Sequence, residues 1–400
     1  MLLKIPTIFF QYILGLIVLP LILIIRLISP FIIIRFGRLN SGRIGHLVAN
    51  TELYLCEIDH GINIPQKPFF DIFFSGDKII SNIYYYNKLK SKINIWPRWF
   101  MRPIFKINDL IPFGEKHKIG NNISKDRDVL NLFDKCSVHF QFNNEEKIKG
   151  NSVIKSMGIS GKFVCLLVRD DAYLNSTYKS KDWTYHDYRN CDIKNYYLVS
   201  NELTKIGFHV IRMGSLAKDK FTTKNPKIID YANSNFRSEF MDVYLGANCE
   251  FCISTSSGWD AIPYIFRKPI IFAPIVPVGY FFSFNERYWG ITKDHVDITT
   301  NKKLTLTEIF ERGAAYLMSS NEFTKKGIQL RENSPEEIKD LVFEFLKYKS
   351  NSKGQKKLED VLEIKFKNLF ANKLKGVTNE KLHGEINGRF GSKFLRNNLK

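Results

Sequence analysis

The regular alternation of buried strands and helices in the second half of the chain is the feature that most limits its fold. "KFVCLLVRD", from Lys162, is typical of a strand buried on both faces, and "NYYLVSNELTKIG" is typical of a helix that ends at Gly207. The strand patterns "FHVIRMG", "CEFCIS" and "PIIFAPI" follow, separated by helical segments such as "SEFMDVYLGA". Strands that alternate with helices form a parallel sheet covered on both faces. The sequence therefore predicts an α/β fold.

The first half is less regular. "PFIIIRFGRLNSGRIGHLVANTELYL" predicts a strand, a glycine-containing loop and a helix that opens near Arg43. "FFDIFFSG" predicts a second strand and "MRPIFKINDLIPFG" a weaker third one, followed by a polar linker and a charged helical segment. Because 400 residues suffice for two domains, we expect two Rossmann-like domains facing a cleft, over residues 35–150 and 151–346.

The N-terminus, residues 1–34, is predicted to be a membrane anchor. Ile8 to Ile25 is an uncharged apolar run of eighteen residues, long enough to span a bilayer as a helix. The first fifty residues contain basic side chains and no acidic ones, which places the following domain on the cytoplasmic side. A full span, an in-plane insertion and a buried core helix all remain open at this point.

The charge indicates a polyanionic neighbour. The net charge is +19, and the segment 347–400 interleaves basic and apolar residues, as in "LEIKFKNLFANKLKG", which is typical of an amphipathic tail on a surface. No RNA-binding signature is present, so we expect an anionic membrane surface as the partner and no nucleic acid.

Polar and basic side chains gather where the predicted strands of the second domain end. Ligands of such sheets bind beyond the carboxyl ends of the strands, and arginine offers planar, bidentate donors to phosphate. We therefore predict a donor-binding set, although each arginine alone fits a structural ion pair equally well. The set is Arg169, Arg189, Asn190, Arg212, Gly214, Asp230, Ser254, Thr255, Ser256, Ser257 and Gly258.

The turn from Ser254 to Gly258 allows three interpretations. Its hydroxyl groups can cap the helix that follows, or its N–H groups can receive a phosphate. "STSSG" also fits a nucleophile elbow with Ser256 as the nucleophile.

From about Arg35 onward the chain resembles a family of bacterial glycosyltransferases from surface-polysaccharide biosynthesis regions. The matching motifs are "GRIGHLVANTELYL", "LLVRDDAYL", "YHDYRNCDIKNYY", "GFHVIRMGS", "IIDYANSNFRSEFMDVYLGANCEFCISTSSG" and "GRFGSKFLRNN". The resemblance implies sugar transfer from a nucleotide-sugar donor to a lipid-linked or surface glycan acceptor. Together with the basic residues that follow the N-terminal apolar run, it leads us to expect the protein at the cytoplasmic face of the bacterial inner membrane. The turn and its flanking strands are also similar to the phosphate-binding loop of GT-B heptosyltransferases, which carry Asp-Thr-Gly-Pro where this chain has Ser256-Ser257-Gly258.

Inverting sugar transfer needs a base for the acceptor hydroxyl, whereas retaining transfer does not, and the sequence does not choose between them. His46 is the preferred base because histidine titrates near neutrality, with Glu52 and Asp71 in reserve. Arg43 and Asn50 are predicted to bind the acceptor, since Asn50 lies one helical turn after His46. His46 simply occupying the first helical turn is the competing interpretation.

We expect no metal and no cofactor. A metal-dependent GT-A enzyme would need Asp-x-Asp after a buried strand, but Asp126 and Asp128 fall in a polar linker and Asp170-Asp171 has the wrong spacing. Cys249 and Cys252 form a single CxxC pair, which is weak support for zinc, and we interpret both as core residues.

The alternative function is a serine hydrolase that uses Ser256. An acid and a histidine would then come from downstream, as Asp294 or Asp297 with His295 or His383. This hypothesis gives the three predicted arginines no role. The sequence does not identify the donor nucleotide, the sugar, the acceptor or the oligomeric state.

Overall fold

The computed structural model describes residues 18–119, 126–177, 182–350, 361–371 and 382–399. The chain divides into two compact units. Unit 1 comprises residues up to 126 together with 136–141, and unit 2 comprises residues 127–135 and everything from 142 onward. The sequence-based domain boundary at residue 150 would have assigned residues 127–135 and 142–150, which belong to unit 2, to the first domain.

Unit 1 is built on a short parallel sheet. Strands β1 (Ile33–Leu39) and β2 (Phe69–Ser75) pair in parallel, from Ile33 opposite Phe69 to Leu39 opposite Ser75. The helices are α2 (Ile44–Asp59), α3 (Ile83–Leu89), α4 (Arg98–Leu110) and the 3-10 turn η1 (Gly114–His117). The predicted strand, loop and helix around Arg43 and the predicted strand "FFDIFFSG" are therefore confirmed.

The third strand predicted in the first half is wrong. Residues 98–110 form α4, which contains Pro103. Met101, Ile104 and Asn108 are its buried residues, and their spacing of three and four residues is that of one helix face. The proline is accommodated in the second turn of the helix, and the buried face decides the conformation.

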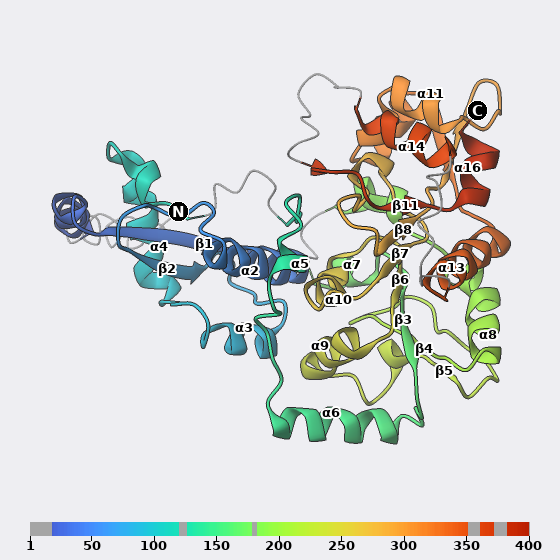
Figure 1. The fold of residues 1–400 in the computed structure, drawn as a ribbon, viewed down its shortest axis with the longest axis horizontal. Coiled ribbons are helices and arrows are strands. Elements are labelled where there is room, and N and C mark those ends of the chain that lie inside the picture. The colour runs from blue at the N-terminus through green and yellow to red at the C-terminus, as the bar shows by residue number, and fades with distance from the viewer. Residues whose placement is uncertain (1–17, 120–125, 178–181, 351–360, 372–381, 400) are drawn as a thin grey trace, which may run out of the picture. The chain divides into compact units, whose positions relative to one another are not determined.

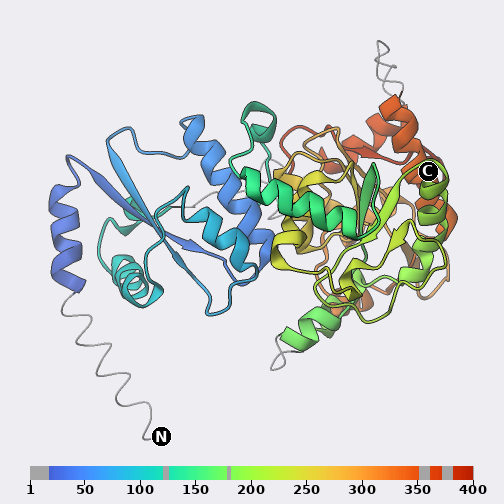
Figure 2. The same ribbon diagram turned by 90° about the horizontal axis from the view of Figure 1, so that it is seen from below.

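A helix over residues 18–28 contributes to the core of unit 1. Val18, Ile22 and Ile25 pack in one cluster with apolar residues of β1, β2 and α4 (dark blue helix in Figure 2). None of the helices in the described residues is long and apolar enough to cross a membrane. Residues 1–17 of the predicted anchor lie outside the described residues. From residue 18 onward one side of the helix, with Val18, Ile22 and Ile25, lies in the core, as in the buried-helix interpretation, whereas Leu19, Leu23 and Ile24 on the other side are exposed.

Unit 2 is built on a seven-stranded parallel sheet of order β11-β8-β7-β6-β3-β4-β5. Its strands are β3 (Phe163–Leu167), β4 (His209–Arg212), β5 (Ile228–Ile229), β6 (Cys252–Ser254), β7 (Ile270–Phe272), β8 (Tyr288–Gly290) and β11 (Arg389–Phe390). A separate antiparallel pair joins β9 (Asp294–Asp297) to β10 (Ile328–Arg331). The large parallel sheet confirms the predicted α/β fold class.

Helices cover both faces of this sheet. Figure 1 shows α9 (Glu239–Asn248) and α10 (Ala261–Ile265) on one face, with α8 (Tyr197–Lys205) and α13 (Pro335–Ser350) on the other. The remaining α-helices are α5 (Leu132–Lys135), α6 (Asn144–Ser156), α7 (Ala172–Thr177), α11 (Leu306–Glu311), α12 (Ser320–Lys325), α14 (Val361–Ala371) and α16 (Ser392–Asn398). The 3-10 turns are η2 (Thr184–Arg189), η3 (Ile193–Tyr196), η4 (Tyr231–Asn233), η5 (Gly258–Asp260), η6 (Val278–Tyr280) and η7 (Ala314–Tyr316).

The described parts of the basic C-terminal segment belong to unit 2. β11 pairs in parallel with β8, and Phe366, Phe370, Phe390 and Leu395 are buried. Of the apolar residues that suggested an amphipathic surface helix, Phe366 and Phe370 are therefore part of the core of unit 2, whereas Ile364 is exposed.

Candidate functional site

The strand order brings the predicted donor-binding residues of unit 2 to one edge of the sheet. β6, β3, β4 and β5 are consecutive neighbours and all parallel, so their carboxyl ends lie at the same edge. Arg169 follows β3, and its backbone N–H donates to Thr255 Oγ1 of the turn after β6 at 2.8 Å. This bond joins two of the predicted elements directly.

Arg169 and Arg189 come close together around Asn190. Arg169 Nη1 donates to Asn190 Oδ1 and to the carbonyl oxygen of His186, the latter at 3.1 Å. Arg189 Nη2 donates to the carbonyl oxygen of Ser256, at the tip of the turn. Desolvation, followed by repulsion from Arg189, lowers the pKa of Arg169 to about 10. Partial burial and repulsion from Arg189 therefore both disfavour the charged form of Arg169.

Within the described residues, neither Arg169 nor Arg189 is paired with a carboxylate; the oxygens they bond are all neutral. Lys293 adds a third cation, since its buried ammonium donates to the carbonyl oxygen of Asn190 at 2.5 Å. Unpaired cations that converge in a poorly solvated place favour an anionic ligand, because burying charge without a counter-charge is costly.

Arg212 lies in a different environment. It is fully buried at the end of β4, with Nη1 at 3.1 Å from Asp230 Oδ1 and Nη2 at 3.7 Å from Asp170 Oδ2. Two carboxylates thus balance its charge. Gly214 follows with a φ of 153°, in a region that favours glycine. Arg212 and Asp230, both predicted to bind the donor, pair with each other, as the structural ion-pair interpretation expects.

The turn from Ser254 to Gly258 is held by its own side chains. Ser254 Oγ donates to Asp260 Oδ1 at 2.5 Å and accepts from Ser256 N at 3.0 Å. Ser257 N donates to Asp260 Oδ2 at 2.7 Å. The N–H groups of Ser256 and Ser257 are therefore engaged within the turn. Ser256 has a φ of 60°, which directs its carbonyl oxygen to Arg189.

Asp260 is a residue that the sequence reasoning missed. It is buried, and burial raises the pKa of its carboxyl group to about 7 although Ser254 and Ser257 donate to it. The signal was present, because Ser257 and Asp260 have the Ser-x-x-acid spacing of a capping box. Lys293 was missed because "YWG", the strand before it, is too short to predict from its pattern.

In unit 1, His46 lies in the first turn of α2, with Nδ1 at 3.5 Å from Asp126 Oδ2. Asn50 Oδ1 is buried and has no hydrogen-bond partner within the described residues. Arg43 is the exposed N-cap residue of α2. His46 and Asn50 thus share one end of the helix, as the spacing predicts.

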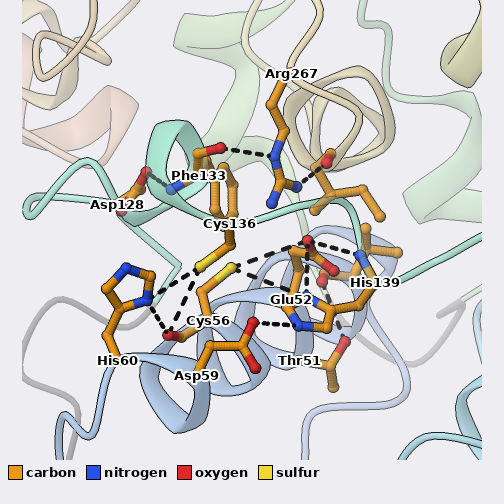
Figure 3. Close-up of polar contacts among 12 residues, drawn as sticks. Thr51, Glu52, Cys56, Asp59, His60, Asp128, Phe133, Cys136, His139 and Arg267 are labelled. Carbon is orange, nitrogen blue, oxygen red and sulfur yellow. Dashed lines mark hydrogen bonds and ion pairs between the residues drawn. The ribbon is translucent and has the colours of Figure 1, made fainter.

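The two reserve bases are engaged elsewhere in unit 1. Asp71 forms a bidentate ion pair with Arg35, at 2.7 and 2.5 Å, and accepts from Tyr54 Oη at 2.7 Å. Glu52 is buried, and its Oε1 lies 3.3 Å from His139 Nδ1 (Figure 3). The hydrogen bond to Glu52, assisted by the charges of Glu52 and Asp59, raises the pKa of His139 above its ordinary value.

Asp126 and Asp128, considered above for a GT-A metal site, bind different partners. Asp126 pairs with His46, whereas Asp128 accepts from the backbone N–H groups of Leu132 and Phe133 at 2.7 and 2.9 Å. Asp128 therefore caps α5, and burial raises its pKa to about 6.

The two histidines considered for the alternative hydrolase form hydrogen bonds with groups other than Ser256. His295 is buried with Nδ1 at 2.9 Å from the Lys293 carbonyl oxygen, and His383 Nδ1 lies 2.5 Å from Ser283 Oγ. Asp297 pairs with Arg312 and Asp294 with Lys303. Within the described residues, no histidine bonds to the Ser256 hydroxyl, so a Ser-His pair is not assembled.

No protein-family model matches the sequence, and no curated protein matches it either. Among solved structures, ADP-heptose LPS heptosyltransferase II from E. coli shares 12% identity, with 61% of this chain and 86% of that chain covered and a TM-score of 0.35. A glycosyl transferase family 9 protein from Veillonella parvula shares 10% identity, with 78% and 97% covered and a TM-score of 0.45. The iron-containing dodecameric glycosyltransferase TibC from enterotoxigenic E. coli shares 11% identity, with 61% and 60% covered and a TM-score of 0.30.

Proposed function

We propose that this protein is a glycosyltransferase that binds a nucleotide-sugar donor through its phosphate groups at the carboxyl edge of the unit 2 sheet. The observation that supports the proposal is the convergence of Arg169, Arg189 and Lys293 around Asn190, with no carboxylate partner within the described residues. A diphosphate carries the charge and the planar acceptor geometry that such a set recognises.

The cations also suit the chemistry of the donor. As the glycosidic bond to the nucleotide breaks, negative charge builds up on the departing phosphate oxygens. Guanidinium and ammonium groups fixed beforehand stabilise that charge without reorganisation. We therefore propose transfer that needs no metal ion at the leaving group and no cofactor.

For an inverting reaction we propose His46 as the base. Its imidazole is partly exposed, and Asp126 at 3.5 Å can orient the ring. Arg43 and Asn50 remain our proposed acceptor contacts, because one is exposed and the other has a buried amide oxygen without a partner in the described residues. Glu52 and Asp71 are not retained, since both carboxylates are held in buried contacts.

The acceptor is proposed to be lipid-linked or part of a surface glycan, at the cytoplasmic face of a bacterial inner membrane. Support comes from exposed apolar side chains on two segments of unit 1, which we propose act together as one membrane-binding face. Leu19, Leu23, Ile24 and Leu27 line the outer side of the helix over residues 18–28, and Trp99, Leu110 and Phe113 are exposed on and after α4. Arg102, Lys106 and Lys116 are exposed in the same segment. Apolar side chains flanked by basic ones, with an exposed tryptophan, are typical of an interfacial surface for anionic lipid.

The donor proposal is tested by thermal unfolding of the full chain with UDP, GDP, CMP, ADP and dTDP. A nucleotide at a hundred times its dissociation constant stabilises the folded state by about 2.7 kcal/mol. We expect one of them to raise the melting temperature of the parent and of Arg312→Ala, which removes an exposed arginine paired with Asp297, but not of Arg189→Ala. A nucleotide that stabilises all three proteins equally would contradict the proposal.

The membrane proposal is tested by sedimentation with phosphatidylglycerol and phosphatidylcholine vesicles. Removing residues up to 30 is a poor test, because Val18, Ile22 and Ile25 would leave the core. The double variant Trp99→Ser, Leu110→Ser changes only exposed side chains, and Ile206→Ser in unit 2 is its control. We expect salt-sensitive binding to phosphatidylglycerol that falls several-fold in the double variant. Equal binding by both variants would contradict a role for this face.

A further inference from the structure

A second group of side chains, inside unit 1, has the composition of a metal site. Glu52 and Cys56 lie one turn apart on α2 and point to the same side of the helix, toward the segment 136–141 (Figure 3). His139 of that segment faces them. All three offer one ligand atom each, and these atoms lie within 4.8 Å of one another.

We propose that Glu52, Cys56 and His139 form a binding site for one Zn²⁺ ion in unit 1. A thiolate, an imidazole and a carboxylate are the ligands that zinc takes in proteins, and a harder cation such as Mg²⁺ would not be held through sulfur. Such a site goes beyond sugar transfer, because none of these side chains belongs to the proposed donor set.

The spacing of the three atoms fits a tetrahedral ion. With Zn–N and Zn–O near 2.0–2.1 Å and Zn–S near 2.3 Å, tetrahedral ligands lie about 3.3 Å apart for N and O and about 3.6 Å apart for S and either of them. Here Glu52 Oε1 and His139 Nδ1 are 3.3 Å apart. Cys56 Sγ lies 4.0 Å from each of them. A shift of a few tenths of an ångström in the thiol brings the triangle to zinc dimensions.

The surroundings of His139 are those of a metal ligand. Its other ring nitrogen, Nε2, lies 3.0 Å from Asp59 Oδ2. Histidines that bind metals through one nitrogen donate the other N–H to a carboxylate or carbonyl, which fixes the ring and its tautomer. Asp59 therefore supplies the expected support, and it comes from the same helix as Glu52 and Cys56.

The nearby thiol of Cys136 does not belong to this group of ligand atoms, so the fourth tetrahedral position would fall to a water molecule. Cys136 Sγ lies 3.8 Å from the Cys56 carbonyl oxygen and 3.3 Å from His60 Nδ1. Cys56 and His139 would give up their protons to solvent on binding, and the ion would fasten segment 136–141 to α2.

The first experiment measures zinc in the full chain, purified with a tag that contains no histidine and without chelator. We expect about one zinc per chain, and a lower melting temperature after extraction with a chelator. Cobalt added to the extracted protein should give the intense visible bands of tetrahedral Co²⁺ together with a thiolate charge-transfer band. A parent protein that shows neither zinc nor a thiolate–cobalt band would overturn the proposal.

Variants locate the ion. Cys56→Ser, His139→Gln and Glu52→Gln should each lose zinc or bind it at least tenfold more weakly, with the thiolate band missing in Cys56→Ser. Cys191→Ser, which removes a thiol from unit 2, should keep one zinc. Equal zinc content in Cys56→Ser and Cys191→Ser would assign the metal elsewhere and overturn the site. Should Cys56→Ser not fold, the cobalt spectrum of the parent still decides.

Discussion

An arginine stands at or just after the end of both β3 and β4, but the two arginines differ in whether carboxylates balance their charge. Arg212, at the end of β4, is fully buried between Asp170 and Asp230. Arg169, just after β3, bonds neutral oxygens, with Arg189 as a neighbouring cation and the carboxylate of Asp187 nearby but not paired with it. One strand end is balanced and the other is left with excess positive charge, although the two strands are neighbours. The position of an arginine at a strand end therefore does not tell its role. The presence or absence of a carboxylate partner does.

The carboxyl group of Asp260 extends this comparison, and its ionisation should give the largest change in stability. Asp260, which accepts hydrogen bonds from Ser254 and Ser257 of the turn, forms no ion pair within the described residues, and burial raises its pKa from 3.8 to about 7. A carboxyl pKa that is higher in the folded than in the unfolded state means that the folded state binds more protons. Its contribution to the free energy of unfolding is thus complete below about pH 4 and is lost as the pH rises toward 7, by something of the order of 4 kcal/mol.

The measurement is urea unfolding of the parent and of Asp260→Asn from pH 4 to 7. The asparagine cannot ionise and keeps one acceptor oxygen for Ser257 N, so the difference in stability between parent and variant should shrink or reverse as the pH rises. A difference that stays constant over this range would show that the carboxyl group is already ionised at pH 4.

Removing the balanced arginine should have the next largest effect. Arg212→Ala leaves Asp170 and Asp230 facing each other without their cation, and breaking a buried ion pair costs about 3 kcal/mol. Arg312→Ala is the control, since its pair with Asp297 is exposed and should cost well under 1 kcal/mol. Equal urea midpoints for the two variants would remove the distinction between the two strand ends.

Removing the unbalanced arginine should change binding and leave stability nearly unaltered. Arg169→Ala loses charge-assisted hydrogen bonds to phosphate of about 1.5–3 kcal/mol, a loss of affinity of roughly 10- to 100-fold. Repulsion from Arg189 disappears at the same time, so the urea midpoint should hardly move. Titration calorimetry with the nucleotide found by thermal unfolding gives the affinity. A large loss of stability with unchanged affinity would mean that Arg169 is structural, like Arg212.

The sheet of unit 2 could be predicted because its strands are short apolar runs between helices, and such runs admit few other folds. The sequence also located the strand ends. It could not separate Arg169 from Arg212, because the partners Asp230 and Asn190 are brought in by turns whose course the pattern does not encode. At both strand ends the sequence shows an arginine after apolar residues. The sequence pattern therefore does not reveal that only one of the two charges is balanced.

Unit 1 was harder to predict for a related reason. The pattern "MRPIFKINDLIPFG" predicted a weak strand, whereas the burial of Met101 and Ile104 on one face makes this segment the helix α4. Val18, Ile22 and Ile25 looked like part of a membrane segment because apolar composition alone does not distinguish lipid from a protein core. The contact of His139 with Glu52 joins positions 87 residues apart, and no local spacing signals it.

The smallest expected effect separates transfer from hydrolysis at the turn itself. The Ser256 hydroxyl has no histidine partner within the described residues, and the turn bonds Arg189 through its carbonyl oxygen instead. Ser256→Ala keeps that carbonyl and all the side chains that hold the turn, so it should lose at most one hydrogen bond to the donor, about 0.5–1.5 kcal/mol. Transfer from the nucleotide sugar should therefore fall by about tenfold or less, whereas removing a nucleophile abolishes turnover. Assays of Ser256→Ala with nucleotide sugars and with ester substrates provide the check. Esterase activity in the parent that vanishes in the variant would favour the hydrolase, and would show that the positive charge beside the turn serves another purpose.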